Sequence, residues 1–305
     1  MSVTSLEELR ERASSSDVRP RVAVAAAHEE HVMGAITKAV SAGMVEVTLV
    51  GRGDKIRALL AKLGADPKRY QIVERESDVE CVEAAVALVR SGEADVLMKG
   101  IVETRDFMRG VVNREKGLRT GRLLSTIGIF EVPGYPKLLS VSDVAITPQP
   151  DLAGKRQIVE ECVECLHALG IEKPLVGMLS AAEQVNPKVL GSEDAAKIAQ
   201  MQRDGEIGGC VVEGPISFDL ATSPEAARIK HYESPVAGQA DLIVVPDLVS
   251  GNVLAKSLMG FGGATVAGLV LGASAPIVLT SRSAGVEDKL NSIALAALFA
   301  RAQAK

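Results

Sequence analysis

Short apolar runs alternate with amphipathic stretches along almost the whole chain. Runs such as 21-RVAVAAA-27, 45-VEVTLVG-51 and 94-ADVLMKG-100 have the length of buried strands. The stretches that follow them, for example 54-DKIRALLAKLG-64, repeat apolar residues with the period of a helix. This alternation predicts an α/β fold, in which mostly parallel strands are joined by right-handed helical crossovers.

The middle of the chain departs from this alternation. The runs 123-LLSTIGIFEV-132 and 138-LLSVSDVAIT-147 follow each other with no helix between them, which predicts a local antiparallel pair. The next segment, 147-TPQPDLAG-154, is polar and rich in proline, and it predicts a domain boundary. Because 305 residues exceed what one core usually supports, we expect two domains.

The uncharged segment 257–281 has the length of a membrane span, but its glycines and Pro276 would break a continuous helix. Two buried strands at 264–271 and 276–280, joined by a turn at 272–275, explain the segment better. The N-terminus is charged and lacks the apolar region of a signal peptide. We therefore expect a cytoplasmic protein that makes no contact with membranes.

Composition and charge limit the ligands that the chain can bind. The net charge is −5 and no long basic run occurs, which argues against a nucleic-acid-binding protein. An anionic ligand would have to be held by a few well-placed arginines.

Two patterns suggest a metal site at first sight. Cys162 and Cys165 form a C-V-E-C motif, but they lie on the apolar stripe of a helical stretch, which predicts core packing. The motif 28-HEEH-31 opens a helix with no third ligand near it in sequence, which predicts a surface helix start. We expect no metal.

Residues directly after a strand are the candidates for ligand contact, since parallel sheets bind ligands beyond the carboxyl ends of their strands. The last strand ends at Ser281 and Arg282, and a helix is predicted from residue 286 to 302. On that helix we expect Asp288 on a polar face with Asn291 and Ser292. From the residues alone, an ion pair between Asp288 and Arg282 explains this pattern as well as a ligand site does.

The stretch 277-IVLTSRSAGVEDKL-290 resembles the C-terminal signature of the phosphate acetyltransferase and phosphate butyryltransferase family. In that signature, a Ser-Arg pair at a strand end is followed, six residues after the arginine, by an aspartate. Further likeness occurs in the same order along the chain, in 94-ADVLMKGIVETRDFMRGVVNREKGLRTG-121, 143-DVAITPQPDLAGK-155, 213-EGPISFDLA-221 and 241-DLIVVPDLVSGNVLAKSL-258. The first of these segments and the chain length are closer to the butyryl branch.

The resemblance implies the reaction acyl-CoA + phosphate ⇌ acyl phosphate + CoA, with coenzyme A as a substrate and no tightly bound cofactor. It also implies a fold like that of isocitrate and isopropylmalate dehydrogenases. Residues 1–149 with 273–305 would form the first domain and residues 150–272 the second, with the active site in the cleft between them. A homodimer or a higher homo-oligomer is expected.

The same resemblance assigns catalytic roles to three residues. The guanidinium of Arg282 would grip two phosphate oxygens, and Ser281 would donate a hydrogen bond to the phosphate or the developing oxyanion. Asp288 would be the base for the CoA thiol. Ordinary carboxylate and thiol pKa values differ by about 4.5 units, so we expect proton removal to be concerted with attack on the carbonyl carbon.

Four further residues are predicted to contact phosphate or CoA. Arg109 matches the N-terminal anion-binding arginine of the family, and Lys99 stands at a strand end. Asn252 and Lys256 belong to the family block GN-x-x-x-K.

One departure and three alternatives accompany this interpretation. Many members of the butyryl branch carry a histidine where this chain has 125-STIG-128. The acyl group could be acetyl instead of butyryl. A metal- and NAD-dependent decarboxylating dehydrogenase would need a cluster of aspartates, which 284-AGVEDKL-290 does not provide. A non-catalytic CoA-binding protein would leave Ser281, Arg282 and Asp288 without a purpose.

Overall fold

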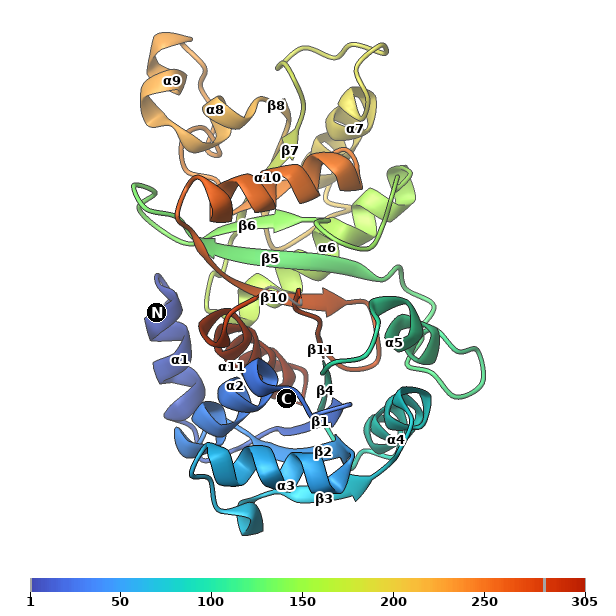
Figure 1. Cartoon of the computed structure of the whole chain (residues 1–305). Helices are drawn as coiled ribbons and strands as arrows, with labels where there is room; N and C mark the ends of the chain where they lie inside the picture. The colour runs from blue at the N-terminus through green and yellow to red at the C-terminus, as the bar shows by residue number, and fades with distance from the viewer. Residues whose placement is uncertain (1, 282–283, 305) are drawn as a thin grey trace. The chain divides into compact units, whose positions relative to one another are not determined.

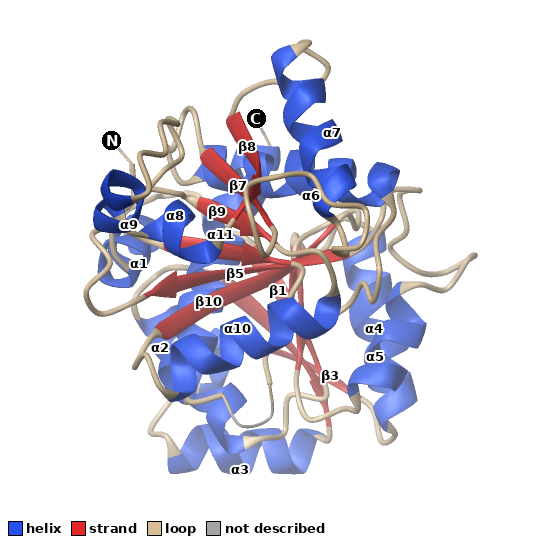
Figure 2. Ribbon diagram, turned by 90° about the horizontal axis from the view of Figure 1, so that it is seen from above, coloured by secondary structure: helices blue, strands red, loops and turns tan. Residues whose placement is uncertain are grey.

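The computed structural model describes residues 2–281 and 284–304. The chain divides into two compact units. We call residues 7–122 with 267–305 the terminal unit, and residues 123–266 with 1–6 the central unit. Each contains mostly parallel strands with helices packed against them (Figures 1 and 2).

Among the described residues, the terminal unit contains six strands, which neighbour one another across the sheet in one order. That order is β3 (Gln71–Glu74), β2 (Glu46–Gly51), β1 (Arg21–Ala25), β4 (Val96–Lys99), β11 (Ile277–Val278) and β10 (Thr265–Leu271), whose first two residues belong to the central unit. All neighbours from β3 to β11 are parallel, and β10 runs antiparallel to β11. The turn between β10 and β11 confirms the two-strand interpretation of this uncharged segment.

Helices cover this sheet on both faces (Figure 1). They are α1 (Leu6–Ser14), α2 (Glu30–Ser41), α3 (Gly53–Lys62), α4 (Asp78–Arg90), α5 (Thr104–Val111) and α11 (Val286–Gln303), with a 3-10 turn, η1 (Pro67–Arg69). Helix α11 packs along α2, and α4 packs against α5 and β1. The sequence did not predict α1, whose Leu6, Leu9 and Ala13 form a buried stripe within a charged segment.

The central unit has its strands in the order β5 (Ser125–Glu131), β6 (Leu139–Ser142), β9 (Leu242–Val244), β7 (Leu175–Leu179) and β8 (Val211–Ile216). Its helices are α6 (Leu152–Ala168), α7 (Ser192–Arg203), α8 (Phe218–Thr222), α9 (Pro224–Ile229) and α10 (Leu248–Gly260). The antiparallel pairing of β5 with β6 confirms the predicted pair.

The compact units do not divide where the sequence placed its boundaries. Strand β6 pairs in parallel with β9, with Ser140 opposite Leu242 and Ser142 opposite Val244. These hydrogen bonds hold residues 123–149 in the central unit, whereas the proline-rich segment had suggested a boundary near residue 150. Sequence cannot reveal such a pairing, because its partner lies about a hundred residues away. The assignment of functional domains stays a prediction.

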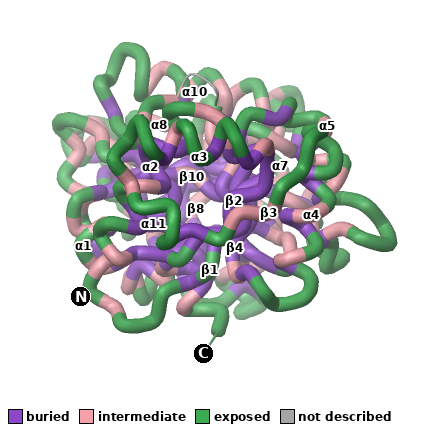
Figure 3. Tube along the Cα trace, turned by 60° about the horizontal axis from the view of Figure 1, so that its bottom comes forward, coloured by how far each residue is buried: buried purple, intermediate pink, exposed green. Residues whose placement is uncertain are grey.

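Burial follows the strands (Figure 3). Strand β4 is buried along its whole length, and β1 is exposed only at Arg21. The free cysteines Cys162 and Cys165 are buried within α6, which confirms core packing for the C-V-E-C motif. His31 is exposed in the first turn of α2, after the capping residue Glu29, as a surface helix start requires. No helix among the described residues combines the length and the apolar character that crossing a membrane would need.

Candidate active site

Three neighbouring parallel strands of the terminal unit end at one edge of the sheet. In β1 and β4, Ala25 lies opposite Lys99, and in β4 and β11, Met98 lies opposite Val278. The ends of these strands therefore lie side by side, with Lys99 as the last residue of β4 and Ser281 in the segment after β11, and both are predicted site residues. Parallel α/β sheets bind their ligands at this edge.

Lys99 is a buried lysine, with an exposed fraction of 3%. Its ammonium donates hydrogen bonds to the carbonyl oxygens of Gly100 (3.2 Å) and Val102 (3.1 Å). It therefore holds the loop after β4. Gly100 lets this loop pass close to β1, since a Cβ atom there would lie 2.1 Å from the Ala26 carbonyl oxygen. Direct contact between Lys99 and a substrate stays a prediction.

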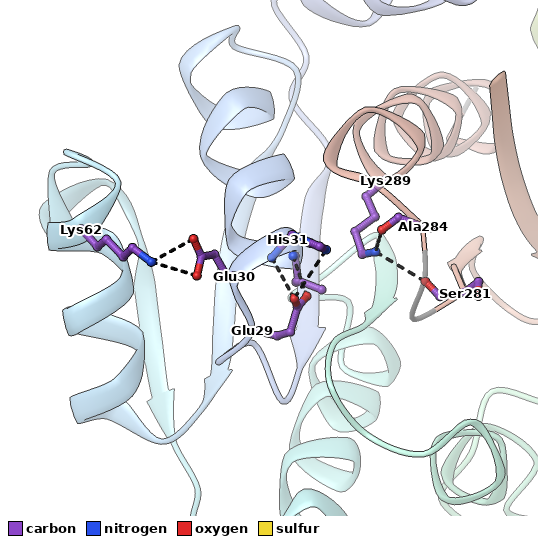
Figure 4. Close-up of polar contacts among 8 residues, drawn as sticks. Glu29, Glu30, His31, Lys62, Ser281, Ala284 and Lys289 are labelled. Carbon is purple, nitrogen blue, oxygen red and sulfur yellow. Dashed lines mark hydrogen bonds and ion pairs between the residues drawn. The ribbon is translucent and has the colours of Figure 1, made fainter.

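Ser281 is exposed, and its carbonyl oxygen accepts the backbone N–H of Ala284 at 3.1 Å. The ammonium of Lys289, in the first turn of α11, donates to the carbonyl oxygens of Ala284 (2.5 Å) and Ser281 (3.5 Å) (Figure 4). Arg282, the predicted phosphate-binding arginine, lies outside the described residues.

Lys289 is itself 3% exposed. Burial lowers its pKa, and the negative charges of Glu29 and Asp288 oppose that shift. The Glu29 carboxylate caps α2 by accepting the backbone N–H groups of His31 (2.9 Å) and Val32 (2.8 Å). Figure 4 shows this cap and the Lys289 contacts in one view. The carboxylate of Glu29, at the start of α2, therefore stabilises the charged form of the buried Lys289 ammonium.

Asp288 is partly exposed in the first turn of α11, after the helix begins at Val286. The predicted polar face around it is wrong, because Asn291 and Ser292 are each only 1% exposed. The Ser292 hydroxyl donates to the Asp288 carbonyl oxygen (2.8 Å) and accepts the N–H of Gly268 in β10 (3.0 Å).

Asn291 is buried because another element, α1, packs against it. The Asn291 side-chain oxygen accepts a hydrogen bond from Arg10 of α1 at 2.9 Å. Elements on more than one side therefore cover α11, which a single apolar stripe does not reveal.

Arg109 lies on α5 with an exposed side chain, 3.3 Å from the carboxylate of Asp106. It borders a cavity of about 400 Å³ between α4 and α5. Val82 and Val86 line this cavity, and Arg90 and Lys116 add positive charge. The position is compatible with the predicted anion contact, which stays a prediction.

In the central unit, a turn follows β6 at residues 143–147 and is organised by the buried carboxylate of Asp143. That carboxylate accepts the backbone N–H groups of Ala145 (2.7 Å), Ile146 (3.1 Å) and Thr147 (3.0 Å). The hydroxyl of Thr126 donates to it from β5 and in turn accepts N–H groups of the turn. Thr126 belongs to the segment 125–128, where the family resemblance led us to note a missing histidine.

Helix α10 carries Asn252 and Lys256, the other two predicted contacts of phosphate or CoA. Asp247 caps its start by accepting the N–H of Ser250 (3.0 Å). A Cβ atom at Gly251 would lie 2.0 Å from the Asp143 carbonyl oxygen, so only glycine allows this approach. Asn252 donates to the Val144 carbonyl oxygen (3.0 Å), and Lys256 is exposed one turn later. The structure therefore brings Asn252 to the turn after β6.

Sequence reasoning missed Lys289, Asp143 and Thr126. Signals existed for two of them. Asp143 opens the segment 143–155 that carried the family resemblance, and Lys289 precedes an unbroken run of small or apolar residues, 293–300, on the same helix. A charged residue in such a helix needs partners.

A family model described as "Phosphate acetyl/butaryl transferase" matches residues 75–297. The chain belongs to this family. The match spans the strand ends at Lys99 and Ser281, the first turn of α11, and the turn at 143–147.

Individual relatives agree with this assignment. Phosphate butyryltransferase from Clostridium acetobutylicum is 41% identical over 298 residues, which are 98% of this chain and 99% of the relative. Phosphate acetyltransferase from Rhizobium meliloti is 43% identical over 272 residues, 89% of this chain and 86% of the relative. The crystal structure of a branched-chain phosphotransacylase from Enterococcus faecalis superposes with a TM-score of 0.83 at 31% identity, covering 92% of this chain and 99% of that chain. The protein is an acyltransferase.

Proposed function

We propose that the protein transfers a butyryl group reversibly between coenzyme A and inorganic phosphate, forming butyryl phosphate and free CoA. One observation carries the proposal. Ser281 and Asp288 belong to the signature that the sequence resembles. Ser281 lies in the segment after β11, at the carboxyl edge of parallel strands, and Asp288 lies in the first turn of α11.

The roles of the loop residues follow from the chemistry of an acyl phosphate. In the direction of CoA acylation, sulfur forms a bond to the carbonyl carbon, the C–O bond to phosphate breaks, and the thiol proton leaves. Asp288 accepts that proton, while Ser281 and Arg282 neutralise charge on the phosphate. Because a carboxylate is a weak base for a thiol, proton transfer accompanies formation of the S–C bond.

Four further residues belong to this proposal. Arg109 and Lys99 of the terminal unit are proposed contacts of phosphate or CoA, and so, separately, are Asn252 and Lys256 of the central unit. The isocitrate-dehydrogenase-like, two-domain architecture that the resemblance implies is part of the same proposal.

Acetyl is the second candidate acyl group, because the Rhizobium meliloti relative, at 43% identity, is a phosphate acetyltransferase. One methylene changes the binding free energy by about 1–3 kcal/mol, so activity on neighbouring chain lengths should overlap.

The test is a panel of acetyl-, propionyl- and butyryl-CoA, each with and without phosphate, in which release of free thiol is followed. We expect release to require phosphate and kcat/KM to be highest for butyryl-CoA. A maximum at acetyl-CoA would favour the second candidate. Absence of phosphate-dependent release with every thioester would contradict both.

We also propose that the protein assembles into a homodimer or a higher homo-oligomer. Helix α10 of the central unit presents exposed Val249 and Val253, and Phe261, directly after the helix, is 96% exposed. Association would remove this apolar surface from water. Light scattering during size-exclusion chromatography would give the mass directly, and a monomer at micromolar concentration would contradict the proposal.

A further inference from the structure

Lys289 connects α11 to the loop that precedes it. Its ammonium donates to the carbonyl oxygens of Ser281 and Ala284, which flank positions 282 and 283 in the sequence. We propose that Lys289 is a positioning residue that fixes the carbonyl groups of Ser281 and Ala284 in the arrangement phosphate binding requires. This inference rests on the proposed function and adds a residue to it.

The burial of Lys289 supports a structural role for its ammonium group. Only 3% of the residue is exposed, and an ammonium without partners is costly at that depth. The two loop carbonyls provide those partners, and its pKa is still lowered by burial. Glu29 and Asp288 are the charged groups that act on it electrostatically. A surface lysine would gain little from such contacts, whereas a buried ammonium needs them, so Lys289 holds these two carbonyl groups in place.

The neighbouring strand has the same kind of contact. Strands β4 and β11 are adjacent and parallel, and the loop after β4 is held by the buried ammonium of Lys99 through the carbonyls of Gly100 and Val102. Two adjacent strand ends therefore lead into loops whose carbonyl oxygens bind a buried lysine. One such contact could be incidental, but two at the same sheet edge indicate a shared means of ordering it.

The direction of these bonds matters for an anion. Carbonyl oxygens carry partial negative charge and repel phosphate, whereas N–H groups and a guanidinium attract it. Lys289 holds the carbonyls of Ser281 and Ala284 toward its own side, on α11. Displacement of a catalytic group by about 1 Å can cost about 10²-fold in rate, so loss of this contact should affect phosphate first.

The test compares Lys289→Met and Lys289→Gln with a control, Lys62→Met. Lys62 is an exposed lysine of the same unit that pairs with Glu30 (Figure 4). We expect Lys289→Met to raise the KM for phosphate and lower kcat, with a combined loss of about 10–100-fold in kcat/KM, and to change the KM for butyryl-CoA little. Lys289→Gln keeps donor N–H groups and should lose less, while Lys62→Met should match the wild type.

A second readout does not depend on activity. Backbone hydrogen exchange in peptides covering 281–290 should be faster in Lys289→Met than in the wild type, because the Ala284 N–H is bonded to the Ser281 carbonyl oxygen, which also accepts from Lys289. If the wild type transfers no acyl group, the proposed function fails, and exchange still decides whether Lys289 holds Ser281 and Ala284 in place. Unchanged exchange, or phosphate kinetics within about twofold of the wild type in a folded Lys289→Met protein, would overturn the inference.

Discussion

The side-chain amide of Asn252 donates a hydrogen bond of 3.0 Å to the carbonyl oxygen of Val144. Val144 belongs to the turn after β6, and Asn252 lies on the helix after β9, the parallel neighbour of β6. The bond therefore joins the segments that follow two adjacent strands. The structure thus gives the Asn252 amide a structural role, since it fixes this turn, while its contact with substrate stays a prediction.

We expect Asn252→Ala to reduce both stability and activity. Loss of one hydrogen bond should lower the free energy of unfolding by about 1 kcal/mol, as measured by urea denaturation. The small loss of stability leaves the protein folded and should not itself change its kinetic constants. If Asn252 also contacts substrate, kcat/KM for butyryl-CoA at saturating phosphate should fall by about 10-fold or more. A variant with reduced stability and unchanged kinetic constants would assign Asn252 to the turn alone.

Thr126 provides a separate test of the same turn. Its hydroxyl donates to the buried Asp143 carboxylate. Thr126→Val keeps the shape of the side chain and removes that donor, and bonds to charged groups contribute about 1.5–3 kcal/mol. We expect a loss of that size in the free energy of unfolding. Thr126→Ser keeps the hydroxyl and serves as the control, and equal losses in the two variants would point to packing of the methyl group instead.

The sequence predicted the secondary structure better than it predicted which helix faces are buried. Alternation of apolar and amphipathic segments predicted almost every strand and helix, because burial imposes its period directly on the chain. It failed for Asn291 and Ser292, since a helical wheel assumes one buried face, whereas β10 and α1 both contact α11.

Some residues of the candidate site could be predicted from the sequence, and others could not. Ser281 and Asp288 could be found from the family signature, which is local in sequence. The bond from Asn252 to Val144 spans 108 positions, and that from Thr126 to Asp143 depends on pairing between strands. Such contacts depend on sheet order, which the periodicity of one segment does not contain.

The role of Asp288 can be separated from that of its neighbour in the same helical turn. Asp288→Asn removes the proposed base with almost no change in size, and a general base typically contributes about 10²–10⁴-fold to the rate. We expect kcat for CoA acylation to fall within that range near neutral pH, in an assay that follows butyryl phosphate consumption. Near-full turnover would refute the assigned role.

Glu287→Gln is the matched control for that substitution. Glu287 pairs with Lys38 (2.5 Å) and Arg10 (3.3 Å), and these contacts lower its pKa. Its side chain is 54% exposed, so the pairs should contribute less than about 1 kcal/mol to stability. Kinetic constants should therefore stay at wild-type values. If Glu287→Gln lost as much activity as Asp288→Asn, charge at the start of α11 would explain both effects.

The cysteines allow a prediction about pH. All four are free and buried, and burial raises the pKa of Cys165 to about 12 and that of Cys210 to about 11. Burial also raises the pKa of Cys81 and Cys162. Because only the thiolate reacts with disulfide reagents, a raised pKa keeps these groups protonated and unreactive at about pH 8, where an ordinary thiol is partly ionised.

We therefore expect native protein at about pH 8 to release less than about one equivalent of thionitrobenzoate from dithionitrobenzoate within minutes. The same sample in concentrated guanidinium chloride should react at every cysteine, which provides the control. The slow native reaction should speed up as pH rises toward these pKa values, because the thiolate fraction grows. Two or more fast thiols in the native protein would contradict the described burial, and they would also add a background signal when the same reagent is used to follow CoA release.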